Sequence, residues 1–166
     1  MDDLETLAEQ VGAALQSRGL MLASAESCTG GWVGAAVTAI AGSSHWYERG
    51  FITYTNESKQ EMLGVAVDTL AEYGAVSEPT VREMAAGALK HSHADVALAI
   101  SGIAGPGGAT LDKPVGTVCV AWALRSGATR AQSFHFDGDR SAVRRQAVCA
   151  ALRGVLEIIA RATLEA

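Results

Sequence analysis

The chain has 166 residues, enough for one domain with a hydrophobic core. Hydrophobic residues make up 49% and charged residues 19%, which excludes a disordered chain. A net charge of -5 gives no general attraction to nucleic acid or to an anionic membrane, and no apolar run approaches the ~20 residues of a membrane span. The acidic start is unlike a signal peptide, and three cysteines are an odd number. We therefore expect reduced thiols in a cytoplasmic protein.

The first third of the chain alternates between helical and strand patterns. Apolar residues at helical spacing predict a helix over 3–18, which Gly19 ends. The apolar run 20–23 predicts a strand, and the small residues after it predict a helix over roughly 29–40. The β-branched and aromatic residues of 50–55 predict a second strand.

Helical signals dominate the middle of the chain. Asn56 is a good N-cap for a short helix over 57–63, and 67–73 predicts another helical turn. Pro79 stands in the first turn of a helix that reaches about residue 91. The almost wholly apolar segment 95–100 predicts a strand at the centre of a sheet.

The last third predicts a hairpin and a long helix. Strands over 115–124 and 129–136 are joined by a short turn, so the sheet is not purely parallel. Asp139 caps a helix to about residue 163 that is apolar on most faces, which indicates burial between the sheet and another surface such as a second subunit. We predict one α/β domain over 1–166, a three-layer α/β/α sandwich around a mixed sheet of about five strands.

The segment 25–32 is the first candidate site. Ser27 is expected at the carboxyl end of the first strand, where open α/β sheets bind their ligands. Thr29, Gly30 and Gly31 would open the next helix with unpaired N–H groups. A hydroxyl beside such donors suits a nucleophile with an oxyanion hole, or a phosphate cradle. The alternative is that Thr29 is only an N-cap and the glycines only allow close packing.

A second glycine-rich turn over 101–108 follows the predicted central strand. It begins at Ser101 and Gly102 and includes Gly105. It matches neither the Walker A motif nor the G-x-G-x-x-G fingerprint. Glycines directly after a buried strand still let a ligand approach the backbone closely. The alternative is a mobile surface loop.

Three arginines gather at the start of the last helix: Arg140, Arg144 and Arg145. Positive side chains at a helix N-terminus oppose its macrodipole, and a bound anion would remove this conflict. Arg140 and Arg144 share a helical face, so one of them is the expected phosphate contact. The alternative is a solvated basic face.

Activation of Ser27 requires a base. No histidine lies in a motif typical of a triad, and no Cys/His spacing resembles a metal site, so we expect no metal. A Ser-Lys pair is the remaining route, and it needs a lysine that is neutral at the working pH. Lys59 follows the second strand, although most lysines are plain surface charges. Cys28 is a rival nucleophile. Neighbours on an extended segment point to opposite sides, so we expect Ser27 to face the site and Cys28 to pack, and the alternative is the reverse.

Five sequence blocks, spread from about residue 20 to 150, occur in the order of the CinA C-terminal domain family, which this chain resembles. The blocks are Ala25-Glu26-Ser27-Cys28-Thr29-Gly30-Gly31, Tyr54-Thr55-Asn56 leading to Lys59, Gly74-Ala75-Val76-Ser77-Glu78, Ser101-Gly102-Ile103-Ala104-Gly105-Pro106 and Lys113-Pro114-Val115-Gly116-Thr117-Val118. The resemblance implies that Ser27 is the nucleophile and Lys59 its general base, with Tyr54 beside them. It also places Gly138-Asp139-Arg140 on the substrate-binding side and the segment from Ser101 and Gly102 in a second ligand-facing loop.

More narrowly, the resemblance is to the family's stand-alone nicotinamide-nucleotide amidases. It implies hydrolysis of the carboxamide of nicotinamide mononucleotide to nicotinate mononucleotide and ammonia, in the recycling of pyridine nucleotides toward NAD. It implies no cofactor, a small nucleotide as the binding partner and, together with the apolar last helix, a homodimer.

Two other functions stay open on the sequence. One is a nucleotide-binding or regulatory module without turnover, of the competence or damage-inducible type. The other is a phosphate-directed nucleotide hydrolase, which the lack of carboxylate clusters for metal ions disfavours.

Overall fold

The computed structural model describes residues 3–165, with side chains described from 3 to 162. Helices and strands follow one another in the order that the sequence predicts. The elements are α1 (Asp3–Ser17), β1 (Leu22–Glu26), α2 (Trp32–Thr38), the 3-10 turn η1 (Ser43–His45), β2 (Tyr47–Ile52), α3 (Asn56–Leu63), α4 (Val67–Tyr73), α5 (Glu78–Lys90), β3 (Val96–Gly102), β4 (Thr117–Leu124), β5 (Thr129–His135) and α6 (Arg140–Glu165).

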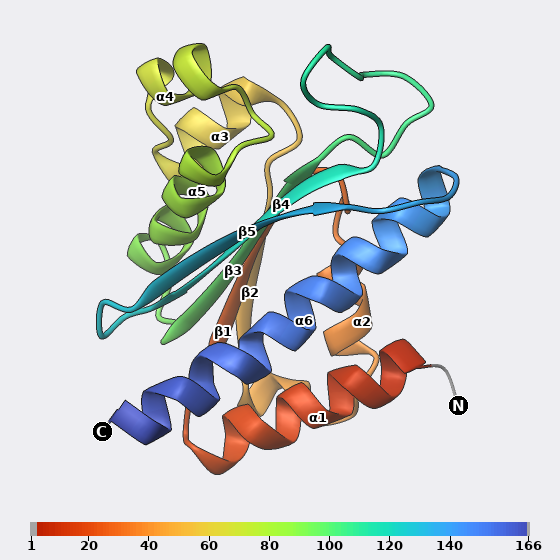
Figure 1. Ribbon diagram of the computed structural model, residues 1–166. Helices are drawn as coiled ribbons and strands as arrows, with labels where there is room; N and C mark the ends of the chain where they lie inside the picture. Colours follow the sequence, from red (N-terminus) through yellow and green to blue (C-terminus); the bar gives the residue numbers. More distant parts are fainter. Residues whose placement is uncertain (1–2, 166) are drawn as a thin grey trace.

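The five strands form one sheet in the order β2-β1-β3-β4-β5. β1 pairs in parallel with both β2 and β3, whereas β3, β4 and β5 pair antiparallel in turn. The predicted mixed sheet, its terminal hairpin and the central place of β3 are therefore confirmed. Because β1, β2 and β3 run in the same direction, their carboxyl ends meet at one edge, at the top of Figure 1.

Helices cover both faces of this sheet, which confirms the three-layer arrangement (Figure 1). One face packs against α1, α2 and α6, and the other against α3, α4 and α5. Within the described residues no helix is long and apolar enough to cross a membrane.

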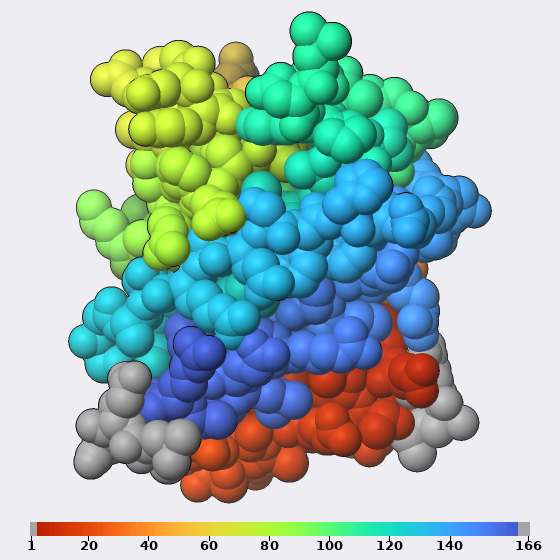
Figure 2. All heavy atoms as spheres, viewed as in Figure 1, coloured from red at the N-terminus to blue at the C-terminus, as the bar shows by residue number. Residues whose placement is uncertain are grey.

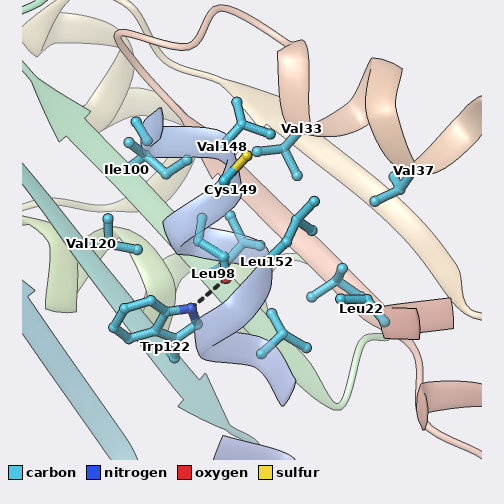
Figure 3. Close-up of a cluster of buried hydrophobic side chains, with 14 of the residues drawn as sticks. Leu22, Val33, Val37, Leu98, Ile100, Val120, Trp122, Val148, Cys149 and Leu152 are labelled. Carbon is cyan, nitrogen blue, oxygen red and sulfur yellow. Dashed lines mark hydrogen bonds between the residues drawn. The ribbon is translucent and has the colours of Figure 1, made fainter. Parts of the chain in front are cut away.

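The two faces of the central strands differ in side-chain size. Successive strand residues point to opposite faces, and here the larger apolar residues point toward α6 and the alanines toward α5. On the α6 side lie Leu22, Val96, Leu98, Ile100, Val118, Val120, Trp122 and Leu124; Figure 3 shows part of this cluster. On the α5 side lie Ala23, Ala25, Ala97, Ala99, Ala121 and Ala123. The small side chains allow α5 to approach the sheet closely.

The apolar surface of α6 is covered within the chain itself. Its buried residues include Val148, Leu152 and Ile159, and the apolar side of α1 belongs to the same cluster. In Figure 1, α1 lies alongside α6 on the outer side of the sheet. The surface expected beside the last helix is thus provided at least in part by α1.

Several element boundaries differ from the prediction because local hydrogen bonds determine them. Helix α2 begins at Trp32 rather than at residue 29, because Gly30 and Gly31 adopt positive φ angles of 57° and 103°. The side chain of Thr55, not Asn56, caps α3 by accepting from the N–H of Ser58.

The two parallel strands beside the site are also shifted relative to the prediction. β1 spans 22–26 rather than 20–23, and β2 spans 47–52 rather than 50–55. The N–H of Thr53 still donates to the Glu26 carbonyl, after which residues 53–55 leave the sheet.

Candidate active site

Ser27 lies at the carboxyl edge of the sheet, directly after β1. Its N–H donates to the carbonyl of Ile100 on β3, so the serine turn lies beside the glycine-rich segment that follows β3. On the other side of β1, the segment after β2 leads into α3, which carries Lys59. The parallel pairing of β1 with both neighbours thus brings the sequence blocks around residues 27, 59 and 101 to one place.

The side chains of Ser27 and Lys59 are in hydrogen-bond contact. The distance from Lys59 Nζ to Ser27 Oγ is 3.2 Å, and Nζ also donates to the Thr53 carbonyl at 3.2 Å. Ser27 continues the alternation of Ala23 and Ala25, which places it on the α3–α5 side of the sheet. The predicted pairing of these two residues is therefore present in the geometry.

Lys59 is buried, with an exposed fraction of 1%. Burial lowers the pKa of its ammonium below the ordinary lysine value, because the charged form loses its hydration. Among the described residues no carboxylate forms an ion pair with Lys59, so nothing offsets this loss with a full negative charge. Such a lysine is suited to accept a proton from the serine hydroxyl.

Burial shifts the pKa of Cys28, the rival nucleophile, in the direction opposite to that of Lys59. Cys28 belongs to the hydrophobic cluster on the α6 side, and burial raises the pKa of its thiol to about 12, despite the opposing effect of Arg144. A thiol is nucleophilic only as a thiolate, which this environment disfavours. The raised pKa of the thiol therefore favours Ser27 as the nucleophile, although Cys28 also borders the open space beside Ser27 and Lys59.

Glu26 organises the turn that carries the serine. Its buried carboxylate accepts from the Thr29 hydroxyl at 2.7 Å and from the N–H groups of Val33 at 2.8 Å and Gly34 at 3.2 Å. A carboxylate at this position satisfies the N-terminus of α2 and complements its dipole. Sequence analysis missed this role, although an acidic residue inside an otherwise apolar strand is an unusual signal.

The predicted cluster of free N–H groups at residues 29–31 is confirmed only in part, because among the described residues the N–H groups of Thr29 and Gly31 have no acceptor but that of Gly30 has one. The N–H of Gly30 donates to the Ser27 carbonyl at 3.0 Å, and the first helical N–H groups of α2 bind Glu26. Thr29 donates its hydroxyl to Glu26 and does not act as the N-cap, which is Gly31. The N-terminus of α2 is consequently already bound by the carboxylate of Glu26.

A cavity of about 180 Å³ opens beside Ser27 and Lys59. Six of the residues predicted for the site line it: Ser27, Tyr54, Lys59, Ser101, Gly102 and Arg140. Predicted site residues that do not line it are Thr29, Gly30, Gly31, Gly105 and Arg144. Most of the predicted residues that line the cavity carry hydrogen-bonding side chains, among them the buried amine of Lys59 and the guanidinium of Arg140.

Comparison with known proteins identifies the family. A model of the CinA C-terminal domain matches residues 4–159. The nicotinamide-nucleotide amidohydrolase PncC of Escherichia coli K12 is 58% identical over 151 residues, which cover 91% of this chain and 92% of that protein. The chain belongs to the CinA C-terminal domain family.

Another relative and a solved structure support the same assignment. The nicotinamide-nucleotide amidohydrolase PncC of Enterobacter agglomerans is 50% identical, covering 92% of this chain and 93% of its own length. A crystal structure of a CinA superfamily protein from Klebsiella pneumoniae superposes with a TM-score of 0.93 at 42% identity, covering 96% of this chain and 99% of that one. The mixed-sheet fold is therefore that of the CinA superfamily.

The two arginines that share a helical face have different partners in this CinA domain. Arg140 donates to the Gly105 carbonyl at 2.8 Å and to the Tyr54 hydroxyl at 3.1 Å, at the cavity. Arg144 donates to the carbonyls of Cys28 and Thr29, at 3.0 and 3.1 Å. Arg140 thus faces the cavity, while Arg144 braces the serine turn.

Asn56, Ala75 and Val76 also line the cavity of the CinA domain. Sequence analysis assigned Asn56 to helix capping and gave the other two residues no role. A signal for all three was present, because each lies in one of the blocks shared with the family. Among the described residues no group of three His, Cys, Asp or Glu side chains is arranged to hold a metal ion.

Proposed function

We propose that this chain is a nicotinamide-nucleotide amidase that works through an acyl-enzyme on Ser27. The observation that carries the proposal is the 3.2 Å contact between Ser27 Oγ and the buried Nζ of Lys59, at a cavity. The names of the relatives supply the substrate class, a nicotinamide nucleotide, and the family resemblance implies nicotinamide mononucleotide within that class. A purely binding module has no need of a buried base in contact with a hydroxyl.

Acylation begins with neutral Lys59, which takes the proton of Ser27 as Oγ attacks the carboxamide carbon. The tetrahedral intermediate then collapses, and protonated Lys59 gives its proton to the departing nitrogen, which leaves as ammonia. The product is an ester between Ser27 Oγ and the pyridine carboxyl carbon. The same lysine thus acts first as base and then as acid.

Deacylation repeats these steps with water as the nucleophile. Neutral Lys59 takes a proton from water, the hydroxide attacks the ester carbon, and the proton returns to Ser27 Oγ. The products are nicotinate mononucleotide and the free enzyme. The lowered pKa of Lys59 increases its neutral fraction at any given pH relative to an ordinary lysine.

Both tetrahedral intermediates carry a negative oxygen that needs hydrogen-bond donors. The N–H of Gly30 already serves the Ser27 carbonyl, and that of Ile103 donates to the Thr117 carbonyl. The candidates that remain are the N–H groups of Thr29 and Gly31 and those of the segment that follows Ile103. One donor of this kind contributes about 3–4 kcal/mol to transition-state stabilisation in a well-studied protease.

The substrate's phosphate is proposed to lie at the cavity mouth. The cavity of about 180 Å³ is smaller than the roughly 300 Å³ at which small-molecule sites usually begin, so it suits the pyridine end only. Arg140 lies where the rest of the nucleotide would emerge, and Arg144 is turned to the serine turn. We assign the 5′-phosphate contact to Arg140, with Tyr54 beside it.

This activity would return nicotinamide mononucleotide to the synthesis of NAD, without a cofactor. A homodimer is part of the same proposal. The experiment is ammonia release from nicotinamide mononucleotide, without added metal, by the wild type, Ser27→Ala and Cys28→Ala. We expect Ser27→Ala to remain folded and inactive, and Cys28→Ala to retain turnover.

Two outcomes would contradict the proposal. Undiminished ammonia release by Ser27→Ala would remove Ser27 as the nucleophile, and loss of release in Cys28→Ala alone would assign that role to the thiol. A folded wild type that binds the nucleotide but releases no ammonia would support the binding module.

A further inference from the structure

A second, larger groove lies between β5 and α6, away from the catalytic cavity. Its volume is about 420 Å³, and it shares no lining residue with the cavity beside Ser27. β5 is the edge strand, and alternate side chains from Arg130 to Phe136 line the groove. Figure 2 shows the face on which β5 and α6 run side by side. This volume falls in the range of about 300–1,000 Å³ typical of small-molecule sites.

Aromatic side chains form one wall and the floor of the groove. Phe134 and Phe136 are half-buried and stacked, with ring centroids 5.2 Å apart and an interplanar angle of 14°. The floor is Trp122, whose indole packs against Gly154 and donates from Nε1 to the Ala151 carbonyl at 2.8 Å (Figure 3). Held in this way, the rings offer a fixed flat surface to a planar ligand.

Positive charge dominates the rest of the lining. Arg130, Arg145 and Arg153 line the groove, whereas Glu157 is its single acidic residue. Arg130 pairs with Glu157 and lies over the Trp122 ring, 5.5 Å from its centroid. Arg153 is exposed and makes no hydrogen bond or ion pair with the described residues. The groove lining therefore carries three guanidiniums against one carboxylate, in a chain of net charge -5.

We propose that this groove binds a small aromatic anion, of the chemical class of a nucleotide. The planar ring would lie against the Phe134–Phe136 pair, and the phosphate would bind the guanidinium of Arg153. The proposal does not depend on the amidase reaction, because it concerns different residues and a different ligand contact.

Charge disfavours a second copy of this chain as the occupant. In a two-fold symmetric contact the groove of one molecule faces the same groove of the second molecule. Arg145 and Arg153 would then approach the same two arginines of the other copy. Like charges brought together in this way cost free energy. A small anion instead neutralises the excess charge.

The test is a titration of the folded wild type with AMP, measured by calorimetry and by tryptophan fluorescence, to which Trp122 contributes. We expect Arg153→Gln to weaken AMP binding at least tenfold. The matched control is Arg161→Gln, which removes the same charge from an exposed position of α6 outside the groove, and we expect a change below twofold. Phe134→Leu is expected to weaken AMP but not inorganic phosphate.

Arg140→Gln separates this groove from the catalytic cavity. Retention of AMP binding in Arg140→Gln, together with its loss in Arg153→Gln, supports the proposal. The reverse pattern would assign the bound AMP to the catalytic cavity, and absence of binding to the wild type would overturn the proposal outright. Equal affinity for AMP and inorganic phosphate, unchanged in Phe134→Leu, would leave an adventitious anion only.

Discussion

Burial of Lys59 lowers the pKa of its amine, which suits it to act as a base. The same burial lowers the free energy of unfolding while the amine is charged. Substitution by Met removes the amine while it keeps a flexible chain of similar length. We expect Lys59→Met to lower kcat about 10²–10⁴-fold, the usual contribution of a general base. Steady-state ammonia release measures this effect. A kcat within threefold of the wild type would exclude Lys59 as the base.

The same substitution has a predicted effect on stability. The pKa of Lys59 is lower in the folded chain than in the unfolded chain, so the unfolded chain binds more protons between these two values. The free energy of unfolding of the wild type therefore rises with pH across this interval. Below the folded pKa the full penalty is present, and Lys59→Met removes it.

Thermal unfolding against pH checks this sign. We expect Lys59→Met to melt above the wild type at neutral pH and the difference to shrink as the pH rises toward the ordinary lysine value of about 10.5. A difference that grows with pH would contradict the assignment of a buried, uncompensated ammonium.

Cys28 provides a control for substitution of its neighbour Ser27. Cys28→Ala should keep kcat within about threefold, because burial keeps the thiol protonated and Lys59 contacts Ser27. It should lower the free energy of unfolding by roughly 1 kcal/mol, the usual cost of a small buried truncation. Denaturant unfolding and ammonia release on one preparation measure both. An inactive but stable Cys28→Ala variant would be inconsistent with this account.

At the scale of elements, Glu26 couples the end of α2 to the serine turn. Glu26→Gln keeps the size of the side chain but replaces one of its two accepting oxygens by an NH₂ group. That group cannot accept a hydrogen bond from the donors that bind Glu26. We expect a loss of about 2–3 kcal/mol in the free energy of unfolding, comparable to one charge-assisted hydrogen bond. We also expect a lower kcat, because the turn no longer holds Ser27 beside Lys59.

Thr29→Val tests the same element more gently. It removes the hydroxyl that donates to Glu26 and leaves the two N–H donors of α2 in place. A smaller loss of stability and of kcat is expected than in Glu26→Gln. Full activity in both variants would show that the turn does not depend on this carboxylate.

Two helical glycines should respond in opposite directions to alanine. A Cβ on Gly154 of α6 would overlap the Trp122 ring, whereas a Cβ on Gly34 of α2 would make an ordinary contact, 3.4 Å from the Tyr47 hydroxyl. Alanine is the better helix former by about 1 kcal/mol. We expect Gly34→Ala to gain up to that amount and Gly154→Ala to lose about 1–3 kcal/mol. Thermal melts measure both, and a stabilised Gly154→Ala variant would contradict the packing.

The sequence predicted most elements but misplaced several ends. Apolar periodicity identified the helix before Gly19 and the buried β3, because these signals arise from burial over many residues. The start of α2 depends instead on the positive φ angles of Gly30 and Gly31 and on the hydrogen bonds of its N–H groups to Glu26. Such contacts involve residues distant in the chain or outside any periodic pattern, so periodicity does not reveal them.

At the scale of the whole molecule, the sheet topology explains why the site was partly predictable. Ser27 and Lys59 were paired through the resemblance to the family, and parallel strands bring them together. The distinction between Arg140 and Arg144 was not predictable, since both share a helical face and only tertiary contacts separate them. The groove between β5 and α6 was missed for the same reason.

The homodimer remains a prediction at this scale. Part of its sequence argument, the apolar last helix, is weakened because α1 covers α6 within the chain. Light scattering on the purified protein would measure the mass directly. A mass of twice 17.1 kDa is expected, and a monomer at micromolar concentration would contradict the prediction.

The most direct test of the central claim is the dependence of kcat/KM on pH for nicotinamide mononucleotide. This quantity reports the ionisation of the free enzyme. Since Lys59 must be neutral to accept the serine proton, kcat/KM should rise with pH and level off above an inflection that lies below the ordinary lysine pKa. A kcat/KM that is flat or falls as the pH rises through this range would contradict activation of Ser27 by neutral Lys59.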